Sequence, residues 1–277
     1  MTAEGIRKEP FSGWTAVAVC FISYMCTFGF VFYGYAVLFP ATVKAMGWQR
    51  GDASIAQTVR ALVAVFIAPL VGYLVVRWGV RKAMMSGGIL MFVGTALIGT
   101  VMDNIWVWTF LWGILVGISF GFMGAVPLQT VATYWFNRYK GTALGIIFTG
   151  AAVGGFLGNP FFTWVMREYK SWQMGWLAAA VFAFVGFAII IWLKNKPEDY
   201  GQHKDGISPE RAAQLDAEAA QQKKMALTYR TTYHFNVKEA ARSPQLYNLM
   251  FSVLMQYSAL VLLVAHGVFH FTDGGLT

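Results

Sequence analysis

Seven long apolar runs divide this sequence of 277 residues. They cover residues 14–39, 54–76, 83–101, 106–131, 142–165, 174–193 and 246–271. A helix of about 20 mostly apolar residues spans the hydrocarbon core of a bilayer. With 57% hydrophobic and 12% charged residues, the chain has too few polar side chains to cover a soluble globule of this size. The sequence therefore predicts an all-α integral membrane protein.

The spacing of the runs predicts three parts. Six runs follow one another closely, and then a polar interval separates them from the seventh. We expect a six-helix transmembrane bundle at 1–193, a linker at 194–245 and one further membrane helix at 246–277. Within the linker, Ser208 followed by Pro209 and Glu210 is typical of a helix start, so we expect a surface helix at 209–224.

The basic residues predict the orientation of the chain in the membrane. Most of the 21 Lys and Arg residues lie in the N-terminal tail, at 77–82, at 138–140 and in the linker. The loops on the opposite side hold Lys44, Arg50, Arg167 and Lys170. Since cytoplasmic loops carry such an excess, we expect a protein of the cell (inner) membrane with a cytoplasmic N-terminus and linker. Basic residues scattered over short loops do not indicate a nucleic-acid partner.

Patterns for catalysis are missing from the sequence. It contains no GxxxxGK[ST] phosphate loop, no HExxH, no GxSxG and no CxxC pair. Cys20 and Cys26 lie six residues apart in one run, where a helix points them in different directions, so we expect two buried thiols rather than a disulfide. We therefore predict that the protein is not an enzyme, that it is not driven by ATP, and that it holds no cofactor or metal.

Two rows of glycines indicate how the helices pack. The rows are Gly113, Gly117 and Gly121 in the fourth run and Gly150, Gly154 and Gly158 in the fifth. Helices in lipid associate through close backbone approach at small residues. We therefore expect tight helix contacts at both rows rather than ligand sites.

Arg60 is the strongest candidate for a functional residue, because a charge inside a membrane span is costly. It lies about six residues into the second run, roughly 9 Å deep at 1.5 Å per residue. Beside Gln57 and mostly small neighbours, its guanidinium could bind a carboxylate in a cavity. The alternative interpretation is that Arg60 extends to the membrane interface and binds a loop carbonyl.

Other polar groups in the runs are weaker candidates. His266 could hydrogen-bond a substrate or be a core histidine bonded to a carbonyl; with His270 it lacks a third metal ligand. Neutral groups that could line a cavity are Tyr24, Thr27, Tyr33 and Tyr35 in the first run and Gln129, Thr130 and Thr133 in the fourth. All 13 Asp and Glu residues lie outside the apolar runs, which favours an anionic substrate over a cationic one.

The segment GYLVVRWGVRK at 72–82 carries a family resemblance. It resembles the motif G-x-L-x-D-R-x-G-R-[RK] between helices two and three of the major facilitator superfamily. The matching residues are Gly72, Leu74, Arg77, Gly79, Arg81 and Lys82, and Val76 stands in place of the usual Asp. In that family the acid pairs with a neighbouring helix and stabilises the outward-open state. The resemblance implies a conformational role for this motif, close helix approach at Gly72, and a weaker charge latch.

Further strings resemble one branch of that superfamily, the oxalate/formate antiporter and monocarboxylate transporter group. They are YGYAVLFP at 33–40, MGWQRGDASIA at 46–56, WFNRYKGTALGI at 135–146, KNKPEDYGQ at 194–202 and HGVFHFTDGGLT at 266–277. Members have two six-helix bundles with the substrate between them. By this resemblance, the chain looks like the N-terminal bundle plus the first helix of an incomplete C-terminal bundle, and the missing half would be its partner.

The resemblance implies secondary transport of a small organic anion, a monocarboxylate or a dicarboxylate, across the lipid bilayer by alternating access, as proton symport or anion exchange. The expected substrate-binding residues are Arg60, His266, Tyr33 and Gln57, and the residues of the 72–82 motif would act in the conformational switch. Two alternatives stay open: a facilitator of a sugar or drug, and a non-transporting membrane scaffold whose linker binds a partner.

Overall fold

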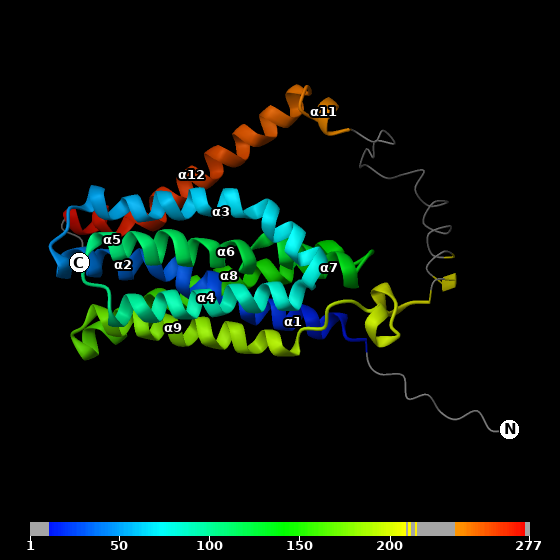
Figure 1. The fold of residues 1–277 in the computed structure, drawn as a ribbon, viewed down its shortest axis with the longest axis horizontal. Helices are drawn as coiled ribbons and strands as arrows, with labels where there is room; N and C mark the ends of the chain where they lie inside the picture. The colour runs from blue at the N-terminus through cyan, green and yellow to red at the C-terminus, as the bar shows by residue number, and fades with distance from the viewer. Residues whose placement is uncertain (1–10, 209, 212–213, 215–235, 275–277) are drawn as a thin grey trace, which may run out of the picture. The chain divides into compact units, whose positions relative to one another are not determined.

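A computed structural model describes residues 11–208, 210, 211, 214 and 236–274. The chain forms two units, Met1–Gly206 and Ile207–Thr277, and each is described by itself. The described residues are mostly helical and contain no β-strand (Figure 1). This architecture confirms the predicted all-α class.

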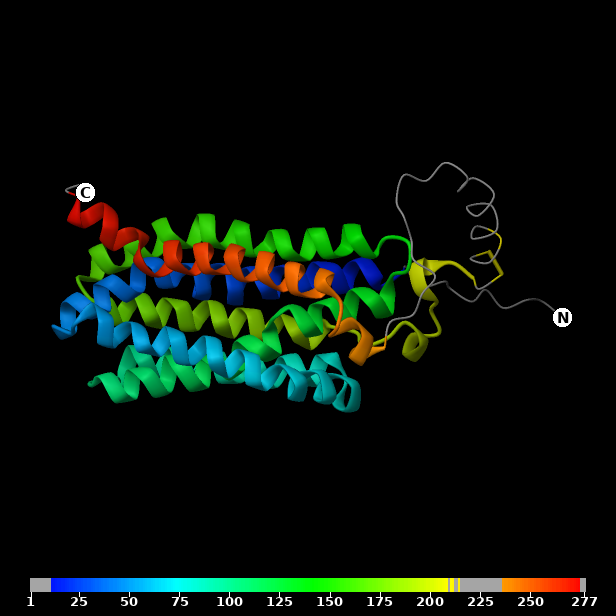
Figure 2. The same ribbon diagram turned by 90° about the horizontal axis from the view of Figure 1, so that it is seen from above.

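The first unit contains six long helical spans that run side by side along one direction (Figures 1 and 2). The first span consists of α1 (Gly13–Tyr24), η1 (Met25–Tyr33) and α2 (Gly34–Met46); the second is α3 (Arg50–Trp78) and the third is α4 (Val80–Thr100). The fourth consists of α5 (Ile105–Trp108), η2 (Thr109–Val116), α6 (Gly117–Met123) and α7 (Ala125–Trp135). The fifth is α8 (Lys140–Tyr169), and the sixth is α9 (Trp172–Ile189) with the short turn η3 (Ile190–Trp192).

The second unit contains α11 (Val237–Ala240) and the long helix α12 (Pro244–Asp273). With α12, seven helical segments among the described residues are long and apolar enough to cross a membrane, which confirms the seven predicted spans. Most of them extend a few residues beyond the apolar runs, because helical hydrogen bonding continues past the last apolar side chain. The Ser208 hydroxyl accepts a hydrogen bond from the Arg211 backbone N–H (3.3 Å), as expected of an N-cap. Most of the predicted helix 209–224 lies outside the described residues.

The glycine rows are tight helix contacts, as predicted. A Cβ atom added to Gly113 would lie 2.9 Å from the Val59 side chain of α3, and one added to Gly117 would lie 3.3 Å from the Arg60 Cα. In the other row, a Cβ on Gly150 would lie 2.6 Å from the Phe21 carbonyl of α1. The rows therefore bring the fourth span onto the second and the fifth onto the first.

Two spans depart from regular α-helix. The segments η1 and η2 are π-helical, with a wider i→i+5 hydrogen bonding that is rare overall and often occurs at functional sites. The fourth span is also interrupted at Gly124 (φ −89°, ψ −155°), where a Cβ would lie 2.5 Å from the Phe120 carbonyl. The π-helical segments were not predicted from the sequence, whereas Pro127, three residues after Gly124, predicts a bend in the fourth span. The two cysteines are free and buried, which confirms that they are not paired.

The 194–206 segment packs on one end of the first unit. Asn195 Oδ1 accepts a hydrogen bond from the backbone N–H of Arg81 at the start of α4 (2.9 Å). The Asp205 carboxylate accepts from the backbone N–H of Arg138 (3.0 Å), just before α8, and Gln202 Oε1 accepts from that of Ser12 (2.9 Å), just before α1. One short segment therefore joins three helix starts that are far apart in the sequence.

We predict that Asn195→Ala lowers the stability of the chain by about 1 kcal/mol, because it removes a side-chain acceptor from the first turn of α4. Asn195→Asp keeps an acceptor there and should retain the stability. Thermal unfolding in detergent measures both. The matched control is Asp199→Ala, on the same segment, whose side chain forms no hydrogen bond with the described residues. Equal stability of Asn195→Ala and the unmodified chain would contradict this role.

Candidate functional site

The site is centred on Arg60, which lies inside the first unit. Its side chain is 7% exposed. Its Nε donates a hydrogen bond to Gln57 Oε1, one turn earlier on α3 (3.1 Å). The same amide oxygen accepts from Trp112 Nε1 on η2 (2.8 Å). Gln57 therefore connects Arg60 to the fourth span, and the geometry favours an interior position over extension to the membrane interface.

Two aromatic rings flank the guanidinium. Its Cζ lies 5.1 Å from the centroid of Phe32, on η1, and 5.2 Å from that of Phe120, on α6. A cation within about 6 Å of an aromatic face is attracted by the ring quadrupole, and more strongly when both are removed from water. Because the two rings come from the first and fourth spans, Arg60 lies where three spans meet.

The site coincides with the two π-helical segments. Phe32 belongs to η1, and Trp112 belongs to η2. The glycine row of the fourth span runs past the same place, since Gly117 approaches the Arg60 backbone. The unusual backbone and the close packing therefore occur around the same side chain.

Three buried side-chain polar atoms of the first unit have no hydrogen-bond partner among the described residues: Tyr35 Oη, Gln57 Nε2 and, on α8, Asn159 Oδ1. The Tyr35 ring, on α2, stacks on Trp112 with 4.7 Å between centroids. The Tyr35 hydroxyl is also close enough to Arg60 to interact with its charge. A buried hydroxyl and a buried amide are both donors that favour an acceptor oxygen.

The other two predicted substrate residues, Tyr33 and His266, are placed differently from Gln57. Tyr33 packs its ring on Gly155 of α8 and contacts Phe32 (5.4 Å between centroids), so its relation to Arg60 runs through that ring. His266 lies on α12 in the second unit, whereas Arg60 lies in the first, so the two residues are described separately. The sequence reasoning missed Phe32, Phe120 and Trp112, because aromatic residues at helical spacing are usually packing residues.

The 72–82 motif forms the end of α3 and the start of α4. Gly79 between them has φ +85°, and a Cβ there would lie 3.0 Å from the Asn195 side chain, so glycine suits this turn. Arg77 Nη1 donates to the Tyr73 hydroxyl one turn earlier (2.7 Å), and Val76 is 75% exposed. At Gly72 an added Cβ meets nothing within 4 Å, so the described residues do not provide the expected close approach.

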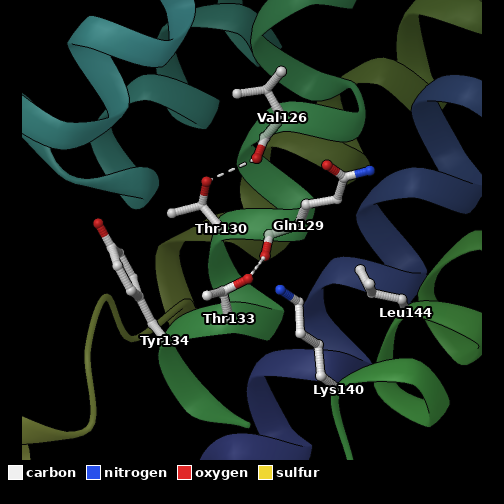
Figure 3. Close-up of a pocket in the computed structure, with 7 residues that line it drawn as sticks. All are labelled: Val126, Gln129, Thr130, Thr133, Tyr134, Lys140 and Leu144. Carbon is white, nitrogen blue, oxygen red and sulfur yellow. Dashed lines mark hydrogen bonds between the residues drawn. The ribbon is translucent and has the colours of Figure 1, made fainter. Parts of the chain in front are cut away.

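A pocket of about 480 Å³ lies between α7 and the start of α8 (Figure 3). Its lining residues are Val126, Gln129, Thr130, Thr133, Tyr134, Lys140 and Leu144. The Thr130 and Thr133 hydroxyls donate to the carbonyls one turn earlier, at 2.8 and 2.7 Å. Gln129, Thr130 and Thr133, which the sequence suggested as cavity-lining groups, thus line a pocket. The two threonine hydroxyls already donate to carbonyls, so they could only accept a hydrogen bond from a ligand.

Residues 14–277 match the family model of the Major Facilitator Superfamily. The chain belongs to this superfamily. The superfamily recognised in the sequence is thereby confirmed, and membership indicates a transport protein rather than an enzyme.

Several curated proteins are similar to this chain. Monocarboxylate transporter 9 of Rattus norvegicus is 27% identical over 155 residues, 55% of this chain and 30% of that protein. Monocarboxylate transporter 13 of Bos taurus is 27% identical over 172 residues, 60% of this chain and 39% of that protein. The riboflavin transporter RibJ of Trypanosoma brucei brucei is 31% identical over 118 residues, 42% of this chain and 21% of that protein. The chain thus spans well under half of the length of these relatives.

We predict that Gly117→Leu destabilises the first unit by about 1–3 kcal/mol, because the new side chain meets the α3 backbone at Arg60 and forces the two spans apart. Gly145→Leu on α8 is the matched control, since a Cβ there meets nothing within 4 Å. Thermal unfolding in one detergent compares the two. Equal effects of the two substitutions would show that the close approach at Gly117 carries no special stability.

Proposed function

We propose that this chain is part of a secondary transporter that moves a small organic anion, a monocarboxylate or a dicarboxylate, by alternating access. Arg60 is the observation that carries the proposal. Its guanidinium lies inside the bundle, where it contacts the Gln57 amide and two aromatic rings. Similarity to proteins named monocarboxylate transporters supports the same substrate class.

A carboxylate fits the donors around Arg60. A guanidinium binds a carboxylate through two parallel N–H···O bonds, and the bond from Nε to Gln57 holds its plane in one orientation. The Tyr35 hydroxyl and the Gln57 amide nitrogen are further donors whose unmet hydrogen bonds an anionic oxygen would satisfy. In this proposal Arg60 is the substrate-binding residue, and Gln57 is both a donor and the residue that positions Arg60.

The transport cycle would require the rest of the protein. We infer a six-helix bundle at 1–193, a cytoplasmic linker at 194–245 and, at 246–277, the first helix of a second bundle that closes over the substrate. His266 would approach the substrate from that second bundle, and Tyr33 from the first span. The 72–82 motif would change conformation between the two states, with proton symport or anion exchange as the coupling.

The distribution of Lys and Arg supports an orientation. We propose that the protein lies in the cell (inner) membrane with its N-terminus, the 72–82 motif and the linker on the cytoplasmic side. The Arg60 site would then lie nearer to the outer surface, and the pocket of Figure 3 nearer to the cytoplasm.

A second candidate function is transport of a neutral aromatic solute. Tyr35, Trp112 and Trp108 form a stack, with 4.7 and 5.9 Å between successive centroids, and one relative is named a riboflavin transporter. These rings are fully buried against one another, so an aromatic solute would stack on them only after the stack opens, whereas the carboxylate proposal needs the charge of Arg60.

We predict that Arg60→Gln raises the apparent KM for carboxylate uptake by about 10-fold to 100-fold, the equivalent of one lost charge-assisted hydrogen bond of about 1.5–3 kcal/mol. Arg60→Lys keeps the charge without the planar fork and should recover only part of the affinity. Uptake into vesicles by the complete transporter measures both.

Arg50→Gln is the matched control, because it removes the same charge from the exposed first residue of α3. Thermal unfolding verifies that each variant is folded. Unchanged carboxylate affinity in a folded Arg60→Gln protein would contradict the carboxylate proposal. Retained uptake of an aromatic solute by that variant would favour the second candidate.

A further inference from the structure

A basic cavity lies at the opposite end of the first unit from the 194–206 segment. It measures about 560 Å³ and lies between the ends of α2 and α8 and the start of α9. Its lining residues are Ala41, Lys44, Ala45, Met166, Lys170, Ser171 and Trp172. We call it the Lys44–Lys170 cavity.

The two lysines meet there from distant parts of the sequence. Lys44 belongs to the last turn of α2, and Lys170 ends α8. Basic residues are scarce in the loops at this end, and yet two of the four line the same cavity. Neither lysine side chain forms a hydrogen bond or ion pair with any described residue. The cavity therefore brings together two positive charges that no close ion pair with a described residue offsets.

The backbone around Lys170 adds to this charge distribution. Lys170 has φ +49°, a left-handed conformation in which a helix end normally has glycine. A lysine in this conformation lowers the stability of the fold relative to glycine, but it places an ammonium group here that glycine lacks. Directly after it, α9 begins without a side-chain cap, because the Ser171 hydroxyl donates instead to Gln173 Oε1 (2.7 Å), and its first turn has no acid. The N–H groups of that turn add a partial positive charge.

The rest of the cavity wall is apolar. Ala41, Ala45 and Met166 lie beside the charged groups, and Trp172 is an aromatic residue of the kind that lies at membrane interfaces. A ligand that fits this lining has an anionic group next to hydrocarbon. Such amphipathic chemistry is that of a phospholipid, whose anionic head group is attracted by lysines close to the membrane surface.

We propose that the Lys44–Lys170 cavity binds the phosphate of an anionic phospholipid head group, with its acyl chains along the apolar wall. The two ammonium groups hold the phosphate oxygens, and the start of α9 orients them. The site is separate from Arg60 and does not depend on the proposed substrate. It would connect the first, fifth and sixth spans to the lipid composition of the membrane.

The test compares lipids on the purified full chain in detergent micelles. Phosphatidylglycerol should raise the Tm by about 2–5 °C and remain bound in native mass spectrometry, whereas phosphatidylcholine should do neither. The double variant Lys44→Gln/Lys170→Gly should lose most of this shift and should raise the apparent Kd for the lipid at least about 10-fold, the change expected when about 1.4 kcal/mol of binding free energy is removed. Lys170→Gly also relieves the left-handed backbone, so the variant should fold at least as well without lipid.

Arg167→Gln is the matched control, since it removes a charge from the same end of α8 but does not line the cavity. It should keep the shift with phosphatidylglycerol. An undiminished shift in the double variant would overturn the proposal. A shift with inorganic phosphate but none with phosphatidylglycerol would overturn the lipid as ligand and assign the cavity to a soluble anion.

Discussion

Close backbone approach between helices is the interaction on which the Arg60 site depends. The glycine row of the fourth span lets α6 contact α3 at Arg60 itself, where a Cβ atom added to Gly117 would lie 3.3 Å from the Arg60 Cα. At that separation the Phe120 ring reaches the guanidinium, and Trp112 reaches the Gln57 amide. A charge that would be costly in hydrocarbon is thereby surrounded by groups that stabilise it.

The two ends of the first unit are built differently. At one end the 194–206 segment joins the starts of α1, α4 and α8 by hydrogen bonds to backbone N–H groups. At the other end Lys44 and Lys170 line a cavity, and neither side chain forms an ion pair with a described acid. The motif at 72–82 has valine at position 76. Another residue of the motif, Arg81, donates its backbone N–H to a neutral amide, that of Asn195. The bonds described at this loop therefore differ from the charge pairing that the motif implies.

The sequence predicted the spans and the glycine contacts, because each follows from a local rule: long apolar helices are needed to cross lipid, and small residues permit close packing. It also singled out Arg60 as a candidate, because a charge within a span is costly, and its role stays a prediction. It did not predict Phe32, Phe120 or the bond between Asn195 and Arg81. Those partners are distant in the sequence and are brought together only by tertiary packing. The π-helical segments were missed as well, since apolar residues at helical spacing do not distinguish i→i+4 from i→i+5 bonding.

The burial of Cys20 and Cys26 makes their reaction with thiol reagents a measure of how often the first span opens. Both thiols lie in the first span, 0% and 2% exposed, and neither is paired. A water-soluble thiol reagent reaches them only when that span opens, so its rate of reaction reports the frequency of opening without any introduced label. Because the same span carries Phe32 and packs on the glycines of α8, this rate follows the part of the bundle on which the Arg60 site rests.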